Sequence, residues 1–102
     1  MEISEINYTG ELHTTAVHLQ SGTLITTDAP RDNEGKGESF SPTDLLCVSL
    51  ATCMLTTMAI KAKKSGFELK TATANVSKFM TSAPRKIERI SILVSCQLDI
   101  VV

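Results

Sequence analysis

The amino-acid sequence predicts an α+β fold, with antiparallel strands before and after one long helix. The first third of the chain alternates apolar and polar residues, the middle holds a nearly uncharged helical segment, and the last third alternates again. The 102 residues have room for one domain covering 1–102, which would bury roughly 60 to 65% of the surface that its unfolded form exposes. We therefore expect a single domain with a modest core.

The first third predicts three short strands. Alternating segments run from Ile3 to Tyr8, from Leu12 to His18 and from Thr23 to Thr27. The turn-forming residues Thr9-Gly10 and Gln20-Ser21-Gly22 separate them. Connections this short favour pairing between neighbours, so we expect an antiparallel meander.

The segment from Thr27 to Ser39 changes character. Its sequence, TDAPRDNEGKGES, combines a proline, an asparagine, two glycines and six charged residues without periodicity. This composition predicts a surface loop. Its length makes the loop a candidate active-site flap.

A long helix is predicted to follow that loop. Ser41 suits the N-cap, Pro42 the first helical position, and Asp44 can complete a capping box while favouring the helix dipole. Positive charge fills the predicted last turn, before Gly66 ends the helix; it comes from Lys61, Lys63 and Lys64. The predicted helix has about 24 residues and is about 36 Å long.

The apolar character of this helix predicts that it is buried. No charged residue lies between Leu45 and Ile60, and apolar positions occur almost all the way round. A membrane span is the alternative interpretation. The charge-free stretch has only about 16 residues and contains Ser49, Thr52, Thr56 and Thr57, whereas a span needs about 20 mostly apolar residues. We therefore expect no membrane association.

The last third predicts two long strands. The segments Phe67 to Met80 and Arg85 to Val102 have strand-like composition, and a turn from Thr81 to Pro84 joins them. The second segment is long for one strand. We expect it to bend near Cys96-Gln97.

Composition and charge exclude several partners. A net charge of -1 provides no long-range field to attract a polyanion, so we expect no nucleic-acid binding. The first ten residues, MEISEINYTG, have neither the basic region nor the apolar region of a signal peptide, which predicts a cytoplasmic protein. His13 and His18 lie five residues apart on one predicted strand and face opposite ways. We therefore expect no shared metal site and no cofactor.

The three cysteines, Cys47, Cys53 and Cys96, form no CxxC pair. Their odd number argues against a structural disulfide framework, so each is either a small buried hydrophobe or a reactive thiol. Cys47 precedes Cys53 by six residues, about 120° round the helix axis, and the two cannot form a disulfide within one straight helix. We interpret Cys47 as a core residue, and Met54, Met58 and Met80 most simply as core filler.

Several motifs together resemble the OsmC/Ohr family, and within it the general OsmC-like (YhfA-type) branch. They are Thr27-Asp28-Ala29-Pro30, Asp32-Asn33, Gly35-Lys36-Gly37-Glu38 and the segment SPTDLLCVSLATC, in which Cys53 follows Pro42 by eleven residues. The resemblance implies a six-stranded antiparallel sheet wrapped around long helices and an intertwined homodimer. It also implies that Cys53 reduces organic hydroperoxides, and the methionines near it would line a hydrophobic peroxide pocket.

The chain departs from the family pattern in three respects. It contains no Cys-Pro dipeptide, which carries the family's second cysteine on a later helix, and we expect the chain to be C-terminally short. Asp44 matches the carboxylate of the general branch but lies about 180° from Cys53 round a straight helix, and a capping role explains it equally well. The counterpart of the family's arginine is His13, with Arg31 as a substitute.

Two functional hypotheses follow. The first is a thiol-dependent peroxidase that uses Cys53, with Asp44, His13 and Arg31 as candidate site residues, an organic hydroperoxide as substrate and an external small-molecule or protein thiol as reductant. The second is a non-catalytic or degenerate OsmC-like dimer that binds a small ligand.

Overall fold

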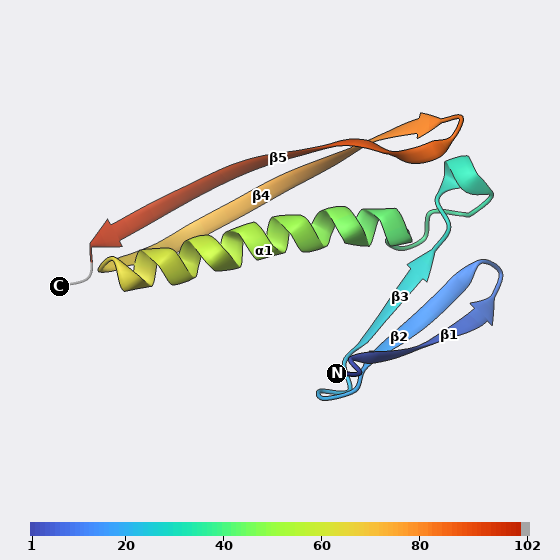
Figure 1. Cartoon of the computed structure of the whole chain (residues 1–102), viewed down its shortest axis with the longest axis horizontal. Helices are drawn as coiled ribbons and strands as arrows, with labels where there is room; N and C mark the ends of the chain where they lie inside the picture. The colour runs from blue at the N-terminus through green and yellow to red at the C-terminus, as the bar shows by residue number, and fades with distance from the viewer. Residues whose placement is uncertain (101–102) are drawn as a thin grey trace. The chain divides into compact units, whose positions relative to one another are not determined.

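The structure is a computed structural model that describes residues 1–100 of the chain (Figure 1). Residues 101 and 102, the predicted end of the last strand, lie outside the described residues. The chain forms two compact units, Met1–Leu45 and a second that begins at Leu46. The prediction of one domain over 1–102 stays a prediction.

The first unit contains the predicted antiparallel meander. Strands β1 (Ser4–Gly10), β2 (His13–His18) and β3 (Leu24–Asp28) form a sheet in the order β1-β2-β3. The β1–β2 turn places Glu11 and Leu12 at positive φ, and the register shifts between Tyr8 and Gly10. Two left-handed residues in a tight hairpin match the twist of the flanking strands, which explains this local backbone.

The predicted surface loop begins later than the sequence indicates. Asp28 still belongs to β3, where it pairs with His13, and it is buried together with Thr27. A short 3-10 helix, η1 (Arg31–Asn33), follows and ends at Glu34 in the left-handed conformation. The remainder of the segment is irregular, as its composition predicts.

The long helix α1 (Pro42–Lys64) has the predicted ends. Ser41 Oγ accepts from the backbone N–H of Asp44 at 3.0 Å, and Asp44 Oδ2 accepts from the backbone N–H of Ser41 at 3.0 Å. This reciprocal pair is the predicted capping box. At the other end, Gly66 has φ +83, a conformation that glycine adopts without a steric penalty.

The expectation of a buried helix is wrong for the single chain. Between Leu46 and Lys64 only Cys47, Ala51 and Ala62 are buried, and they lie within about 60° of one another round the axis. The other elements of the same chain therefore cover only the narrow strip of the helix surface that carries these three residues. A second face stays exposed and carries several large apolar side chains, and Ser49, Thr52 and Thr56 form a polar stripe that adjoins it.

The second unit is completed by a long hairpin of β4 (Phe67–Ser82) and β5 (Arg85–Ile100), which pair antiparallel along their length. In Figure 1 both strands run alongside α1 and curve over it. The register shifts between Leu69 and Thr71, opposite Gln97. The extra residue is Lys70 on β4, and a bulge bends the strand that carries it. The bend predicted in the second long strand near Cys96-Gln97 stays a prediction.

The described fold is therefore α+β, with one helix and antiparallel strands, as predicted. The five described strands form a three-stranded and a two-stranded sheet, where the resemblance implied one sheet of six. By length and composition alone, α1 also qualifies as a candidate membrane span. An apolar helix of a soluble protein passes the same test, so the composition of α1 does not decide between the two.

Candidate functional site

Cys53 lies in the middle of α1 with its side chain exposed. Its Sγ is 4.0 Å from Oγ1 of Thr57, one helical turn later. Because residues four apart share a helix face, Cys53 and Thr57 are oriented the same way. A thiol at this position is accessible to a small reactant.

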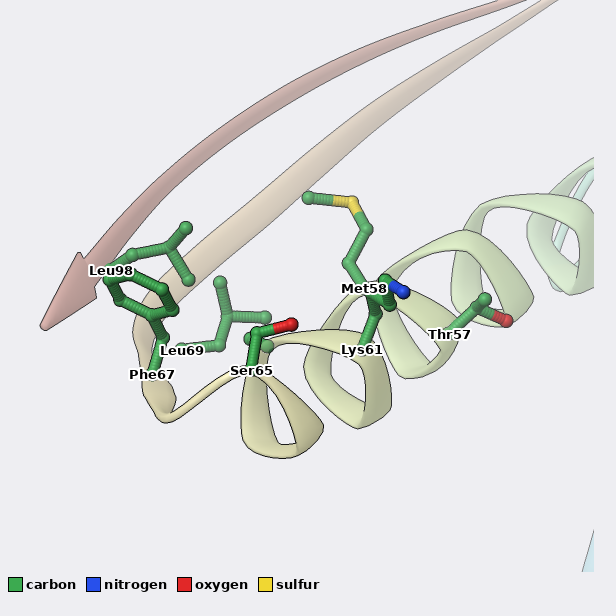
Figure 2. A pocket seen from close by; sticks show the side chains of 8 residues that line it. Thr57, Met58, Lys61, Ser65, Phe67, Leu69 and Leu98 are labelled. Carbon is green, nitrogen blue, oxygen red and sulfur yellow. The ribbon is translucent and has the colours of Figure 1, made fainter. Parts of the chain in front are cut away.

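An apolar cleft begins at Thr57 and lies between the last turns of α1 and the two strands. It has a volume of about 500 Å³, within the range of small-molecule pockets. Figure 2 shows Met58 projecting from the helix toward the strands, where Leu69 and Leu98 form a cross-strand pair. The lining residues are Thr57, Met58, Lys61, Ala62, Ser65, Phe67, Leu69 and Leu98. Met58 thus lines a hydrophobic pocket in the second unit, but it lies about 140° from Cys53 round the helix axis, and Thr57 is the lining residue on the side of the thiol.

Cys53 also belongs to the exposed apolar face of α1. At about 100° per residue, Leu46, Leu50 and Ile60 fall within about 60° of Cys53 round the axis. Their side chains are 58%, 45% and 52% exposed. By the same count Ser49, Thr56 and Thr57 also lie within about 60° of Cys53, so the exposed face that carries the thiol combines these polar side chains with uncovered leucine and isoleucine side chains.

The other two cysteines lie in different environments. Cys47 is 2% exposed, which confirms its interpretation as a core residue. Cys96 is exposed and pairs with Ala72 across the hairpin. No disulfide is formed, and all three thiols are free.

The candidate residues His13, Arg31 and Asp44 belong to the first unit, whereas Cys53 belongs to the second. Their assembly into one site therefore stays a prediction. Arg31 donates from Nε to the backbone carbonyl of Lys36 at 3.2 Å, so its guanidinium takes part in closing the loop. Asp44 forms the capping box described above, which accounts for its position without a chemical role.

His13 lies beside a residue that sequence reasoning missed. Its Nε2 is 3.6 Å from Oδ1 of Asp28, whose side chain is fully buried. The backbone N–H of Glu38 donates to Oδ2 of Asp28 at 2.9 Å. This hydrogen bond holds the pKa of Asp28 below its ordinary value; burial opposes the shift, and the nearby His13 assists it.

The loop folds back on Asp28 through its backbone. Asp28 N–H donates to Phe40 C=O at 3.1 Å, Ala29 N–H to Leu12 C=O at 3.1 Å, and Gly37 N–H to Ala29 C=O at 3.3 Å. Residues 29–40 thus return to the end of β3 through backbone hydrogen bonds, and the Glu38 N–H bonds to the Asp28 carboxylate. The sequence signal that could have identified Asp28 is an aspartate at the end of a threonine-rich strand, but its neighbours from Ala29 onward have the composition of a surface loop.

Comparison with known proteins identifies relatives for most of the chain. Residues 35–100 match the family model described as OsmC-like protein. A crystal structure of a protein from Psychrobacter arcticus 273-4, proposed to be an osmotic stress induced and detoxification response protein, has 47% sequence identity and a TM-score of 0.90. The match covers 98% of this chain and 73% of that chain.

The uncharacterized protein YmaD of Bacillus subtilis (strain 168) is 37% identical over 51 residues. That match covers 49% of this chain and 34% of the relative, so the chain matches about a third of the length of this curated protein. The matched family region includes Cys53, the capping box and the hairpin.

Proposed function

Because this chain belongs to the OsmC-like protein family, we propose that it is a stress-related redox protein that reduces organic hydroperoxides through Cys53. The observation that carries the proposal is the exposed Cys53 thiol, 4.0 Å from a residue that lines an apolar cleft. A cleft of this kind suits the organic part of a hydroperoxide. The similar protein from Psychrobacter arcticus, which is proposed to be an osmotic stress induced and detoxification response protein, supports the same class of function.

In the proposed reaction, the Cys53 thiolate attacks the distal oxygen of the hydroperoxide and the O–O bond breaks. The sulfur takes over the distal hydroxyl group and becomes a sulfenic acid. The leaving alkoxide takes up a proton from the solvent, which balances the proton that the Cys53 thiol lost on ionising, and departs as an alcohol. An external thiol then forms a mixed disulfide with Cys53 and releases water. A second thiol reduces that disulfide, restores Cys53 and leaves as an oxidised disulfide.

An external reductant fits the placement of the cysteines. Cys47 is buried on the same straight helix as Cys53, about 120° away, so it cannot reach the sulfenic acid. Cys96 lies on β5 and is exposed. We propose that small-molecule or protein thiols of the cytoplasm supply the electrons, since that compartment keeps thiols reduced.

We also propose that the working form is a homodimer. The apolar face of α1 that surrounds Cys53 needs cover, and a second copy presents an identical face. Burial of Leu46, Leu50 and Ile60 would then place Cys53 at the subunit interface. Covering this face with protein rather than lipid also leaves Thr52, about 100° from Cys53 round the axis, on the side that faces water.

A second candidate function is the binding of a small apolar ligand without chemistry. The apolar cleft of about 500 Å³ favours it, because a cleft of that size is sufficient for a ligand whether or not the thiol reacts. The two functions predict different roles for Cys53: it is essential for peroxide reduction and dispensable for binding.

The decisive test is the consumption of cumene hydroperoxide with dithiothreitol as reductant. We expect turnover by the wild-type chain, no turnover by Cys53→Ser, and little change for Cys96→Ser, the matched exposed thiol. Equal consumption by wild type and Cys53→Ser would overturn the proposed reaction. Retained binding of an apolar fluorescent probe in a chain without turnover would favour the second function.

A further inference from the structure

A buried carboxylate oxygen in the first unit has no hydrogen-bond partner. Asp28 is 1% exposed, and among the described residues its Oδ1 accepts no hydrogen bond. Nε2 of His13 lies 3.6 Å from this oxygen, farther than the roughly 2.7–3.2 Å of an N–H···O hydrogen bond. Leaving such an oxygen unpaired is costly, and a ligand that reaches it would remove that cost.

Two further side chains lie near the Asp28 carboxylate. Each of His13, Asp28 and Glu38 offers one possible ligand atom, and these three atoms all lie within 4.8 Å of one another. An imidazole nitrogen with two carboxylate oxygens is a donor set that borderline divalent metal ions accept. We infer that His13, Asp28 and Glu38 bind a divalent transition-metal cation such as Zn²⁺.

The distance between the His13 and Asp28 ligand atoms fits such an ion. Metal–nitrogen and metal–oxygen bonds of about 2.1 Å in a tetrahedral site put neighbouring ligand atoms about 3.4 Å apart. The observed 3.6 Å between His13 Nε2 and Asp28 Oδ1 is close to that value. Glu38 is exposed, so its side chain can close the remaining distance by a change of rotamer.

The backbone holds two of the ligands in place before any ion arrives. His13 and Asp28 face each other as a register pair of β2 and β3. The loop brings Glu38 to the same point, because its own N–H is bonded to Asp28 Oδ2. Three protein ligands leave a fourth coordination position for water or another small ligand. His18 lies five residues from His13 on β2 and takes no part.

The inference can be tested without reference to the proposed peroxide chemistry. Zn²⁺ is titrated into reduced, EDTA-treated and dialysed protein, and heat and bound metal are measured. We expect one ion per chain with wild type, and affinity at least about tenfold lower for Glu38→Gln, the loss that removing even an outer partner of a metal ligand produces. Glu34→Gln, a loop glutamate outside the cluster, is the matched control and should bind like wild type.

Two measurements distinguish binding at this cluster from binding elsewhere on the chain. Imidazole NMR signals of the wild-type chain should shift for His13 on addition of Zn²⁺ while those of His18 stay in place, and this readout needs no variant. Cys53→Ser should bind as wild type does. Three results would each overturn the site: His13 signals that do not move, equal Zn²⁺ affinities of Glu38→Gln and Glu34→Gln, or loss of Zn²⁺ binding in Cys53→Ser. His13 and Asp28 would then form only an ion pair.

Discussion

At the scale of single residues, the fate of oxidised Cys53 is the most informative property. One equivalent of cumene hydroperoxide should add the mass of one oxygen to the intact chain, and Cys53→Ser should block that addition. The reason is that buried Cys47 cannot attack the sulfenic acid from the same helix. Excess peroxide should add a second oxygen as sulfinic acid forms. A loss of two hydrogens with a Cys53–Cys96 link would show instead that Cys96 resolves the sulfenic acid.

Asp28 gives the stability of the metal-free chain a predictable pH dependence. Its folded pKa is lowered, chiefly by the Glu38 N–H, so the ionised carboxylate favours the folded state. That contribution is fully present above the unfolded pKa of about 3.9 and is lost as pH falls through the lower folded value. In urea unfolding with EDTA present, wild type should be more stable than Asp28→Asn at neutral pH, and the difference should shrink in acid. A difference that grows on acidification would contradict the assignment.

At the scale of elements, the capping box should contribute measurably to α1. Ser41→Ala removes the acceptor for the Asp44 N–H, so the free energy of unfolding should fall by about 1 kcal/mol. Urea denaturation measures this loss. Ser49→Ala, an exposed serine inside the same helix, should change the free energy of unfolding by less than about 0.5 kcal/mol. Equal losses in the two variants would mean that the cap does not stabilise the helix.

The loop of residues 29–40 depends on a close backbone approach at Gly35. A Cβ at this position would lie 1.7 Å from the carbonyl oxygen of Ala29, so Gly35→Ala forces the loop backbone to move. Gly22→Ala is the comparison, because Gly22 has φ +76 in open space and its alanine meets only backbone strain of about 1 kcal/mol. We expect the larger loss of unfolding free energy for Gly35→Ala, measured by urea denaturation. A smaller loss at Gly35 would show that the loop adapts freely.

At the scale of the whole molecule, the exposed face of α1 predicts self-association. Leu50 lies in the apolar face that also contains Cys53, and burying a leucine contributes about 1.5–3 kcal/mol. Leu50→Glu should therefore raise the dimer dissociation constant by roughly tenfold or more. Sedimentation velocity over a concentration series measures this change.

Thr52→Glu places the same charge on the polar stripe of α1 and should leave association unchanged. A wild-type chain that sediments as a folded monomer at micromolar concentration would contradict the proposed dimer. Weakened association in both variants alike would mean that the contact does not involve the apolar face.

The sequence by itself determined the features that depend on neighbours a few residues apart. The ends of α1 follow from Ser41, Pro42, Asp44 and Gly66, because capping groups contact backbone within one helical turn. The three strands of the meander and the long hairpin follow from alternation and turn residues. The loop motifs together with the segment that ends at Cys53 were sufficient to identify the family.

Only the tertiary structure decided which of these residues meet. Asp28 looked like part of a solvated loop, yet pairing with His13 and closure of the loop bury it beside Glu38, ten residues later. The apolar helix likewise exposes the face that carries Cys53, because the rest of the chain buries only the strip that carries Cys47, Ala51 and Ala62. Both outcomes depend on contacts between distant segments, and local propensity contains no information about which distant surface will be available.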